Sequence, residues 1–330
     1  MRYFVTGATG FLGGRLVRQL REAGHEVVAV VRDPDRARDL DALGIELHRG
    51  DITDRESLRR PMTGTGGVFH LAAWYKVGEK NKAAEAINVG GTRNVLELML
   101  ELGIPKGVYT STLAVFSDTG GRLVDETYRH DGPFLSLYDR TKWQAHYEVA
   151  LPLIQKGLPL VIVQPGLIYG PGDQGPSHDA WTQYLTGKMP LVPKQTTFCW
   201  AHVDDVARGH ILAMEKGRPG ESYILAGPCH PFTEAIDLAE RLTGVKAPRL
   251  RPGPGVMKAM AGLMKILGAV LPLPAQYNAE SIRIVAGVTY IGTNEKAKRE
   301  LGYDPRPLEE GLRETLRWEM EQLGIRKTAA

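Results

Sequence analysis

The fold is decided at the start of the chain, where Tyr3-Phe4-Val5 is followed at once by TGATGFLGG, residues 6–14. The first three residues have the composition of a short buried strand, and Leu16, Val17 and Leu20 recur beyond the glycines at helical spacing. A strand, a tight glycine turn and the start of a helix form an anion site, because free backbone N–H groups and the helix dipole point at the ligand.

The glycines of this turn have the spacing GxxGxxG, one residue longer than the dinucleotide fingerprint GxGxxG. Three roles can still be matched: the turn itself, close approach to a pyrophosphate, and close packing of helix on strand. A glycine-rich loop without a ligand is the alternative. We expect the cofactor to be bound here by Gly7, Thr9, Gly10, Phe11, Leu12 and Gly13.

The second strand, residues 26–31, ends at Arg32, the place that faces the adenosine ribose in such folds. A carboxylate there pairs with the 2′-hydroxyl of NAD, whereas an arginine accommodates the 2′-phosphate of NADP. Arg36 adds a second guanidinium, while Asp33 would bring a carboxylate to the ribose if the register shifted by one residue. We therefore expect NADP(H), with NAD(H) as the alternative.

Strands and helices alternate through the first half of the chain. Strands are expected at residues 2–6, 26–31, 45–48, 67–71, 106–111 and 159–164, and helices near 12–23, 34–42, 54–60, 82–102 and 137–156. Such alternation predicts an α/β fold of the Rossmann type, a doubly wound parallel sheet. We expect a dinucleotide-binding domain over residues 1–167, to which residues 196–226 return, and a smaller substrate-binding lobe over most of 168–330.

Tyr138 and Lys142 lie four residues apart on one of the expected helices, so one helical turn places them on the same face. A phenol has a reference pKa of about 10, and a nearby cation would move that pKa toward neutrality. The pair therefore predicts acid-base chemistry. Asp51, Leu71–Ala73 and Thr110–Thr112 follow expected strands, so all of these motifs share the ligand-binding edge of one sheet.

Composition agrees with an enzyme and excludes some other classes. The 330 residues carry a net charge of +3 without a basic run, which argues against nucleic acid. Cys199 and Cys229 lack metal spacing, so we expect reduced, structural thiols and no metal site. The chain starts with its first strand and shows no signal peptide, which favours the cytoplasm.

One apolar stretch, Met257 to Leu273, is interrupted by Lys258 and Lys265. Its length lies at the low end for a membrane span, and the lysines argue further against one. We expect a buried helix or a lid over an apolar substrate, with a helix lying on a membrane surface as the alternative.

Several motifs together resemble those of the extended short-chain dehydrogenases/reductases over essentially the whole chain. They are TGATGFLGG from Thr6, GDITD from Gly50, HLAA from His70, NVGGT from Asn88, YTSTLAVFS from Tyr109, YDRTK from Tyr138, QPGLIYGPGD from Gln164 and HVDDVA from His202. The VRDP at Val31 resembles the dihydroflavonol reductase and hydroxysteroid dehydrogenase branch more than the sugar epimerases.

The resemblance implies roles for the central residues. Tyr138 would exchange a proton with the substrate oxygen, and Lys142 would lower the Tyr138 pKa and hold the nicotinamide ribose. Thr112, or its neighbour Ser111, would donate a hydrogen bond to the same oxygen. Asn88 matches an asparagine that is as much structural as catalytic.

The resemblance also implies further contacts. Those to the cofactor would come from Asp51, Ile52, Leu71, Ala72, Ala73, Thr110, Pro165, Gly166 and Ile168, and substrate walls from Trp74, Tyr75, Phe116 and Tyr169. Asp51 has the alternative of capping the following helix, and a structural role is expected for His202.

The expected function is an NADP-dependent interconversion of a ketone or aldehyde and an alcohol on a moderately apolar small molecule. A nucleotide-sugar epimerase or dehydratase is the first alternative, but Leu167 stands where those relatives have Asn, and Arg32 displaces their aspartate. A non-catalytic NADP-sensing protein is the second. Relatives pair through helices matching residues 82–102 and 137–156, so we expect a homodimer without nucleic-acid or membrane partners.

Overall fold

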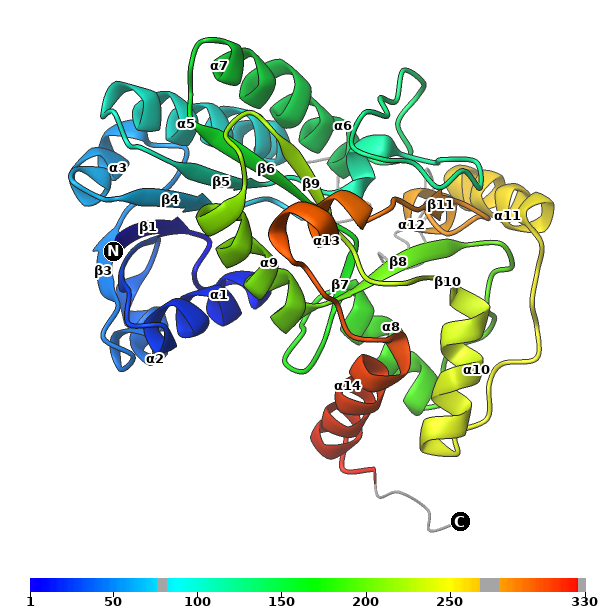
Figure 1. The fold of residues 1–330 in the computed structure, drawn as a ribbon. Coiled ribbons are helices and arrows are strands. Elements are labelled where there is room, and N and C mark those ends of the chain that lie inside the picture. Colours follow the sequence, from blue (N-terminus) through cyan, green and yellow to red (C-terminus); the bar gives the residue numbers. More distant parts are fainter. Residues whose placement is uncertain (76–81, 268–278, 326–330) are drawn as a thin grey trace.

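A seven-stranded parallel sheet forms the centre of the molecule, with the strand order β3-β2-β1-β4-β5-β6-β9 (Figure 1). The computed structural model describes residues 1–75, 82–267 and 279–325. The strands are β1 (Arg2–Thr6), β2 (Glu26–Val31), β3 (Glu46–Arg49), β4 (Gly67–His70), β5 (Gly107–Thr110), β6 (Leu160–Pro165) and β9 (Ser222–Leu225). Every neighbouring pair is parallel, which confirms the expected Rossmann-type fold.

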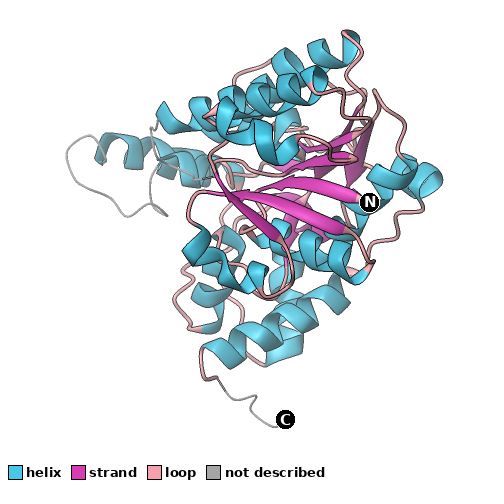
Figure 2. Ribbon diagram, turned by 90° about the vertical axis from the view of Figure 1, so that its left-hand side faces the viewer, coloured by secondary structure: helices cyan, strands magenta, loops and turns pink. Residues whose placement is uncertain are grey.

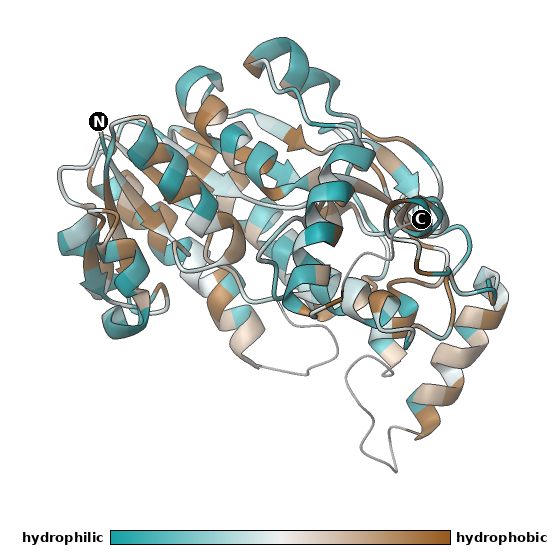
Figure 3. Cartoon of the chain, turned by 90° about the horizontal axis from the view of Figure 1, so that it is seen from below, coloured by the Kyte–Doolittle hydropathy of each residue, from teal (hydrophilic) through white to brown (hydrophobic). Residues whose placement is uncertain are grey.

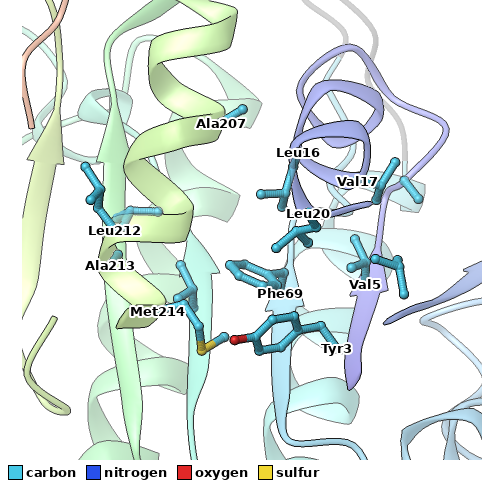
Figure 4. Packing of buried hydrophobic residues seen from close by; sticks show 14 of the residues in the cluster. Tyr3, Val5, Leu16, Val17, Leu20, Phe69, Ala207, Leu212, Ala213 and Met214 are labelled. Carbon is cyan, nitrogen blue, oxygen red and sulfur yellow. The ribbon is translucent and has the colours of Figure 1, made fainter. Parts of the chain in front are cut away.

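Helices cover both faces of this sheet (Figure 2). One face carries α1 (Phe11–Glu22), α2 (Arg38–Asp41), α9 (Val203–Lys216) and α13 (Glu295–Leu301); the other carries α3 (Arg55–Met62), α5 (Thr92–Glu101) and α7 (Leu151–Gln155). Leu16 and Leu20 of α1 pack with Ala207 and Met214 of α9 around Phe69 of β4 (Figure 4). Each of the two helices thus buries its apolar side against the sheet.

Two expected helices each contain a π-helical turn. Residues 82–102 form α4 (Lys82–Glu85), the π turn Ala86–Gly91 and α5, while 137–156 form α6 (Leu137–Gln144), the π turn Ala145–Ala150 and α7. Hydrophobic spacing predicts a helix but does not reveal such a turn, which often marks a functional site.

A second, smaller sheet organises the C-terminal lobe. Its strands are β7 (Leu167–Tyr169), β8 (Thr197–His202), β10 (Cys229–Pro231) and β11 (Thr289–Tyr290), with β8 in contact with the other three. Around it lie α8 (Pro176–Leu185), α10 (Phe232–Thr243), α11 (Pro254–Leu267), α12 (Ala279–Arg283) and α14 (Leu308–Gln322). Trp181, Trp200 and Leu312 lie in the core of this lobe.

The cysteines are not free thiols in the structure. Cys199 of β8 and Cys229 of β10 are direct partners across two antiparallel strands and form a disulfide. The expectation of reduced thiols is therefore wrong. Their sequence separation of 30 gives no metal or disulfide pattern, because the pairing arises only when β10 folds back onto β8.

Helix α11 covers the first part of the apolar stretch 257–273, whereas residues 268–278 lie outside the described part of the chain. Met257 and Ala261 are buried, but Val256, Leu263 and Ile266 are 57%, 54% and 69% exposed. The expectation of a buried helix holds for only one side of α11. Within the described residues, no helix is long and apolar enough to cross a membrane.

Candidate active site

The glycine turn is packed so tightly that side chains are excluded at two positions. Gly7 has a φ of +78°, and a Cβ there would lie 2.7 Å from the Ala72 nitrogen. A Cβ on Gly13 would lie 2.0 Å from the Gly7 carbonyl oxygen. Helix α1 follows Gly10, and no side chain caps its N-terminus. The free N–H groups fit the diphosphate of a dinucleotide, as the sequence predicts.

Thr6, the last residue of β1, ties this turn to the end of β4. Its Oγ1 accepts hydrogen bonds from the backbone nitrogens of Leu71 (3.2 Å) and Ala72 (3.1 Å) and lies 2.8 Å from His70 Nδ1. The segment 71–73 therefore runs directly beside the glycine turn, where small residues leave room for a ligand.

At the end of β2, two arginines lie free in solvent while the neighbouring aspartate is engaged. Arg32 and Arg36 are exposed, and neither has an ion pair within the described residues. The Asp33 carboxylate accepts a hydrogen bond from the Asp35 nitrogen (3.2 Å) and caps the turn that follows. The corner thus presents two guanidinium groups and holds its nearest carboxylate in a local turn.

The end of β3 carries Asp51 and Ile52. Asp51 Oδ1 accepts hydrogen bonds from the nitrogen (2.9 Å) and hydroxyl (2.8 Å) of Thr53, so one carboxylate oxygen closes a local turn. Ile52 is buried, and its side chain fills the space where a Cβ on Gly91 would stand. Both residues thus support the backbone around the expected adenine site.

Tyr138 lies in the first turn of α6, which Ser136 caps by accepting from the Asp139 nitrogen (3.0 Å). The Tyr75 ring meets the Tyr138 ring edge-on, with centroids 4.6 Å apart. Burial and the neighbouring Tyr75 raise the pKa of the Tyr138 phenol, while the Thr112 hydroxyl beside it acts in the opposite direction.

Lys142 lies one turn further along α6 and is buried. Its Nζ donates to Tyr109 Oη (3.1 Å) and to the Thr110 carbonyl oxygen (2.8 Å), and burial lowers its pKa to about 7. Lys142 is not among the groups that shift the Tyr138 pKa here, so its expected effect on that phenol stays a prediction. The Lys142 ammonium is held at the end of β5, and burial of the phenol is the largest cause of the raised Tyr138 pKa.

Two neighbouring hydroxyls at the end of β5 point in different directions. Ser111 is buried, and its Oγ lies 2.8 Å from His146 Nδ1. Thr112 is half-buried and faces Tyr138, while its Oγ1 also accepts from the Ala114 nitrogen (3.1 Å). The structure therefore brings Thr112 to Tyr138 and directs Ser111 to His146.

Asn88 connects two parts of the site from within a π turn. Its Oδ1 accepts from the Trp74 nitrogen (2.7 Å), and its Nδ2 donates to the Trp74 carbonyl oxygen (3.1 Å) and to Thr141 Oγ1 (2.9 Å). The Asn88 amide thus links the segment after β4 to α6, which is a positioning role.

Comparisons with known proteins agree with this geometry. The chain matches the model of the NAD dependent epimerase/dehydratase family over residues 3–226. It is 32% identical to a putative dihydroflavonol 4-reductase of Synechocystis over 325 residues, 96% of this chain and 94% of the relative. The chain belongs to the NAD dependent epimerase/dehydratase family.

Two further proteins place it within the family. A 3 beta-hydroxysteroid dehydrogenase/Delta 5→4-isomerase of Mycobacterium tuberculosis is 30% identical, with 92% of this chain and 86% of the relative covered. The crystal structure of gox2253 matches with a TM-score of 0.84 at 32% identity and 98% coverage of both chains. The chain is an NAD(P)-dependent oxidoreductase of the extended short-chain type, as the motifs predict.

The aromatic residues expected as substrate walls in this family member separate into two groups. Tyr75 is 45% exposed and touches Tyr138, while Trp74 is buried beside it. Phe116 and Tyr169 are each 1% exposed and belong to the hydrophobic clusters around Leu113 and Trp200. Their expected contact with substrate is not supported, because core packing takes up both rings.

Other expected cofactor contacts are partly engaged by the protein itself. Thr110 Oγ1 lies 2.8 Å from His210 Nε2 of α9, on the opposite face of the sheet from α6. A Cβ on Gly166 would lie 2.1 Å from the Cys199 carbonyl oxygen, so this glycine allows β8 to approach. Pro165 is buried at the end of β6, and Ile168 is half-buried in β7.

His202 lies in the lobe, away from Tyr138, beside Asp204 and Glu314. The three side chains offer ligand atoms within 4.8 Å of one another. Arg15 lies 3.5 Å from Asp204, and Arg306 donates to Glu314 at 3.0 Å, so guanidinium groups already balance both carboxylates. The cluster is best described as an ion-pair network that fixes α9 and α14.

No sequence motif indicated the lobe residues that contact α6. Glu280 Oε1 accepts from the Leu137 nitrogen (3.1 Å), Arg283 donates to the Leu135 carbonyl oxygen (3.0 Å), and Tyr290 donates to Asp139 Oδ2 (3.2 Å). Burial raises the pKa of Asp139 to about 6. These contacts span more than 140 residues and follow no local motif.

Proposed function

We propose that this protein is an NADP-dependent oxidoreductase that interconverts a ketone or aldehyde with an alcohol on an apolar small molecule. The observation that carries the proposal is the meeting of Thr112 and Tyr138 at the carboxyl edge of the sheet, with Lys142 one helical turn away. A hydroxyl donor beside a phenol is suited to binding and protonating one substrate oxygen.

In the reducing direction, the Tyr138 hydroxyl gives its proton to the substrate oxygen as the carbonyl becomes an alcohol. Thr112 donates a hydrogen bond to the same oxygen and stabilises the charge that develops there. Lys142, one helical turn further along α6, would hold the hydroxyls of the nicotinamide ribose. The dinucleotide, when bound along the glycine turn, supplies the hydride.

NADP is favoured over NAD by the corner at the end of β2. The exposed guanidinium groups of Arg32 and Arg36 suit a 2′-phosphate, which accepts bidentate, charge-assisted hydrogen bonds. One oxygen of the Asp33 carboxylate accepts a hydrogen bond from the Asp35 nitrogen, so this neighbouring carboxylate is partly engaged in a local turn.

An apolar substrate is supported by Tyr75, an exposed aromatic ring against Tyr138, and by the steroid in the name of one relative. A panel of cyclic and linear ketones and their alcohols, followed by nicotinamide absorbance with NADP(H) and with NAD(H), tests the proposal. Turnover of apolar ketones with NADPH is expected. Conversion of UDP- or dTDP-sugars instead would assign the chain to the sugar-modifying enzymes of its family.

We also propose a homodimer paired through residues 82–102 and 137–156, the two segments that carry the π turns. Light scattering of the purified protein is expected to give twice the mass of one chain. A monomeric mass would contradict this assembly.

A further inference from the structure

Helix α11 carries three large apolar side chains on its solvent side. Val256, Leu263 and Ile266, here named the apolar stripe, are 57%, 54% and 69% exposed. At 3.6 residues per turn they fall within about 80° of one another around the helix. Figure 3 shows α11 as a pale and brown helix at the margin of the molecule.

The opposite side of α11 is already packed. Met257 and Ala261 are buried against Ile282 and Ala286, and Met264 joins the same cluster. The apolar stripe therefore lies on the side of α11 that is turned away from α12 and its neighbours. A second apolar face on the same helix points to an external partner.

The charge around the stripe has a single sign. Residues 241–267 contain six lysines and arginines and no aspartate or glutamate, although the whole chain has nearly balanced charge. Lys258 and Lys265 are exposed on α11, and Lys246 and Arg249 are exposed in the segment before it. Among the described residues none of these four has an ion pair; Arg251 alone is paired, with Asp237.

We propose that α11 is an interfacial helix by which this protein docks on an anionic lipid surface. The apolar stripe enters the boundary between headgroups and acyl chains, and the lysines contact the lipid phosphates. Their long aliphatic stems allow the ammonium groups to reach the headgroups while the helix lies flat. The α11 helix has 14 residues, so it lies on the bilayer and does not span it.

A second copy of the chain is the competing occupant, and the charges argue against it. In a symmetric pairing of α11 helices, the same basic residues would face each other across the interface, with no carboxylate in 241–267 to balance them. An anionic surface satisfies both the apolar and the basic part of the patch. The inference does not depend on the reaction that the enzyme catalyses.

Vesicle flotation of the full-length protein tests the proposal. We expect binding to phosphatidylcholine vesicles that contain about one third phosphatidylglycerol, weaker binding in high salt, and little binding to pure phosphatidylcholine. The variant Val256→Ser/Leu263→Ser/Ile266→Ser should bind at least about tenfold more weakly. Lys258→Gln/Lys265→Gln should lose about tenfold on the anionic vesicles.

Matched control variants show whether a loss of vesicle binding is specific to α11 or follows from removing any exposed leucine or lysine. Leu123→Ser removes another exposed leucine, 63% exposed, and Lys156→Gln/Lys188→Gln removes two exposed lysines elsewhere. Both should bind vesicles as the parent does, and all variants should keep its thermal midpoint and cofactor affinity.

Three outcomes would overturn the proposal. The first is that the parent does not bind anionic vesicles, and the second is equal binding by the parent and the triple serine variant. The third is a fall in the solution mass of the triple serine variant, which would assign the stripe to contact between copies. If the triple serine variant has a lowered thermal midpoint, the single variant Ile266→Ser and the variant Lys258→Gln/Lys265→Gln test the proposal by the same measurements of vesicle binding and solution mass.

Discussion

The edge of the large sheet and the C-terminal lobe both contribute to the surroundings of Tyr138, but they do so in different ways. At the sheet edge, a residue's place follows from its position just after a parallel strand, as with Arg32 after β2 and Thr112 after β5. In the lobe, Glu280 and Tyr290 reach α6 through tertiary packing alone. The residues of the first region can be predicted from short sequence motifs, whereas the lobe residues that contact α6 follow no such motif.

The largest effect is expected at the sheet edge itself, from Tyr138→Phe. Loss of the phenolic proton donor should lower kcat about a thousandfold, within the range for general acid-base groups, while NADPH affinity stays near the parent value. Tyr147→Phe, which removes a phenol bonded to the Tyr128 carbonyl oxygen, is the matched control. Turnover at the parent rate by Tyr138→Phe would falsify the acid-base role.

Within the lobe, the largest loss of stability is expected from removal of the disulfide. Changing Cys199 and Cys229 to serine opens the link between β8 and β10, and we expect a loss of about 2–4 kcal/mol in unfolding free energy. Denaturant unfolding with and without reductant measures the loss. Mass spectrometry after thiol alkylation checks the link; two free thiols in the unreduced protein would contradict it.

Arg32→Ala tests whether the sheet edge selects the cofactor. Removing a charge-assisted contact to the 2′-phosphate should weaken NADPH binding by about 10- to 100-fold and leave NADH binding unchanged. Arg38→Ala, which removes an exposed guanidinium near Asp35, is the control. Equal affinity of the parent for NADPH and NADH would reject the assignment of NADP.

The pH dependence of kcat/KM should report Lys142, whose pKa lies at about 7. The folded pKa is below the ordinary lysine value, so the ammonium form is present at low pH and is lost as the pH rises through 7. Activity that needs the ammonium should therefore fall on the alkaline side of 7. In Tyr109→Phe the Lys142 ammonium loses one hydrogen-bond acceptor. The Lys142 pKa should then fall, so the loss of activity on the alkaline side should begin about one pH unit lower.

Lys142→Arg serves as the comparison for that profile, because a guanidinium stays charged throughout this pH range. Whatever activity the variant retains should show no alkaline limb near neutrality. Superimposable profiles of the parent and Tyr109→Phe would show that the Tyr109 contact does not set the Lys142 pKa.

The smallest effect is expected from Glu280→Gln, which tests whether the contact between the lobe and α6 stabilises that helix. Glu280 places a carboxylate at the N-terminus of α6, where negative charge and a hydrogen bond are favourable, so we expect a loss of about 1 kcal/mol in unfolding free energy. A few-fold drop in kcat should accompany it. Glu309→Gln, which breaks an exposed pair with Arg313, should leave kcat unchanged.

The sequence predicted the parts of this molecule that depend on local geometry. Gly13 is required by its contact with the Gly7 carbonyl oxygen, and Gly7 has a positive φ, so the requirement for glycine arises within one strand-turn-helix unit and its spacing identified the turn. The pairing of Cys199 with Cys229 and the burial of Phe116 and Tyr169 depend on how distant segments meet, and no local pattern records that. In the same way, spacing placed Lys142 near Tyr138 but did not reveal that its ammonium donates to Tyr109.

Helix α12 is only five residues long, yet it touches both the first turn of α6 and the inner side of α11. It therefore connects the helix that carries Tyr138 with α11. Substitutions in α12 should consequently change turnover and surface behaviour together, so neither can be interpreted without measuring the other.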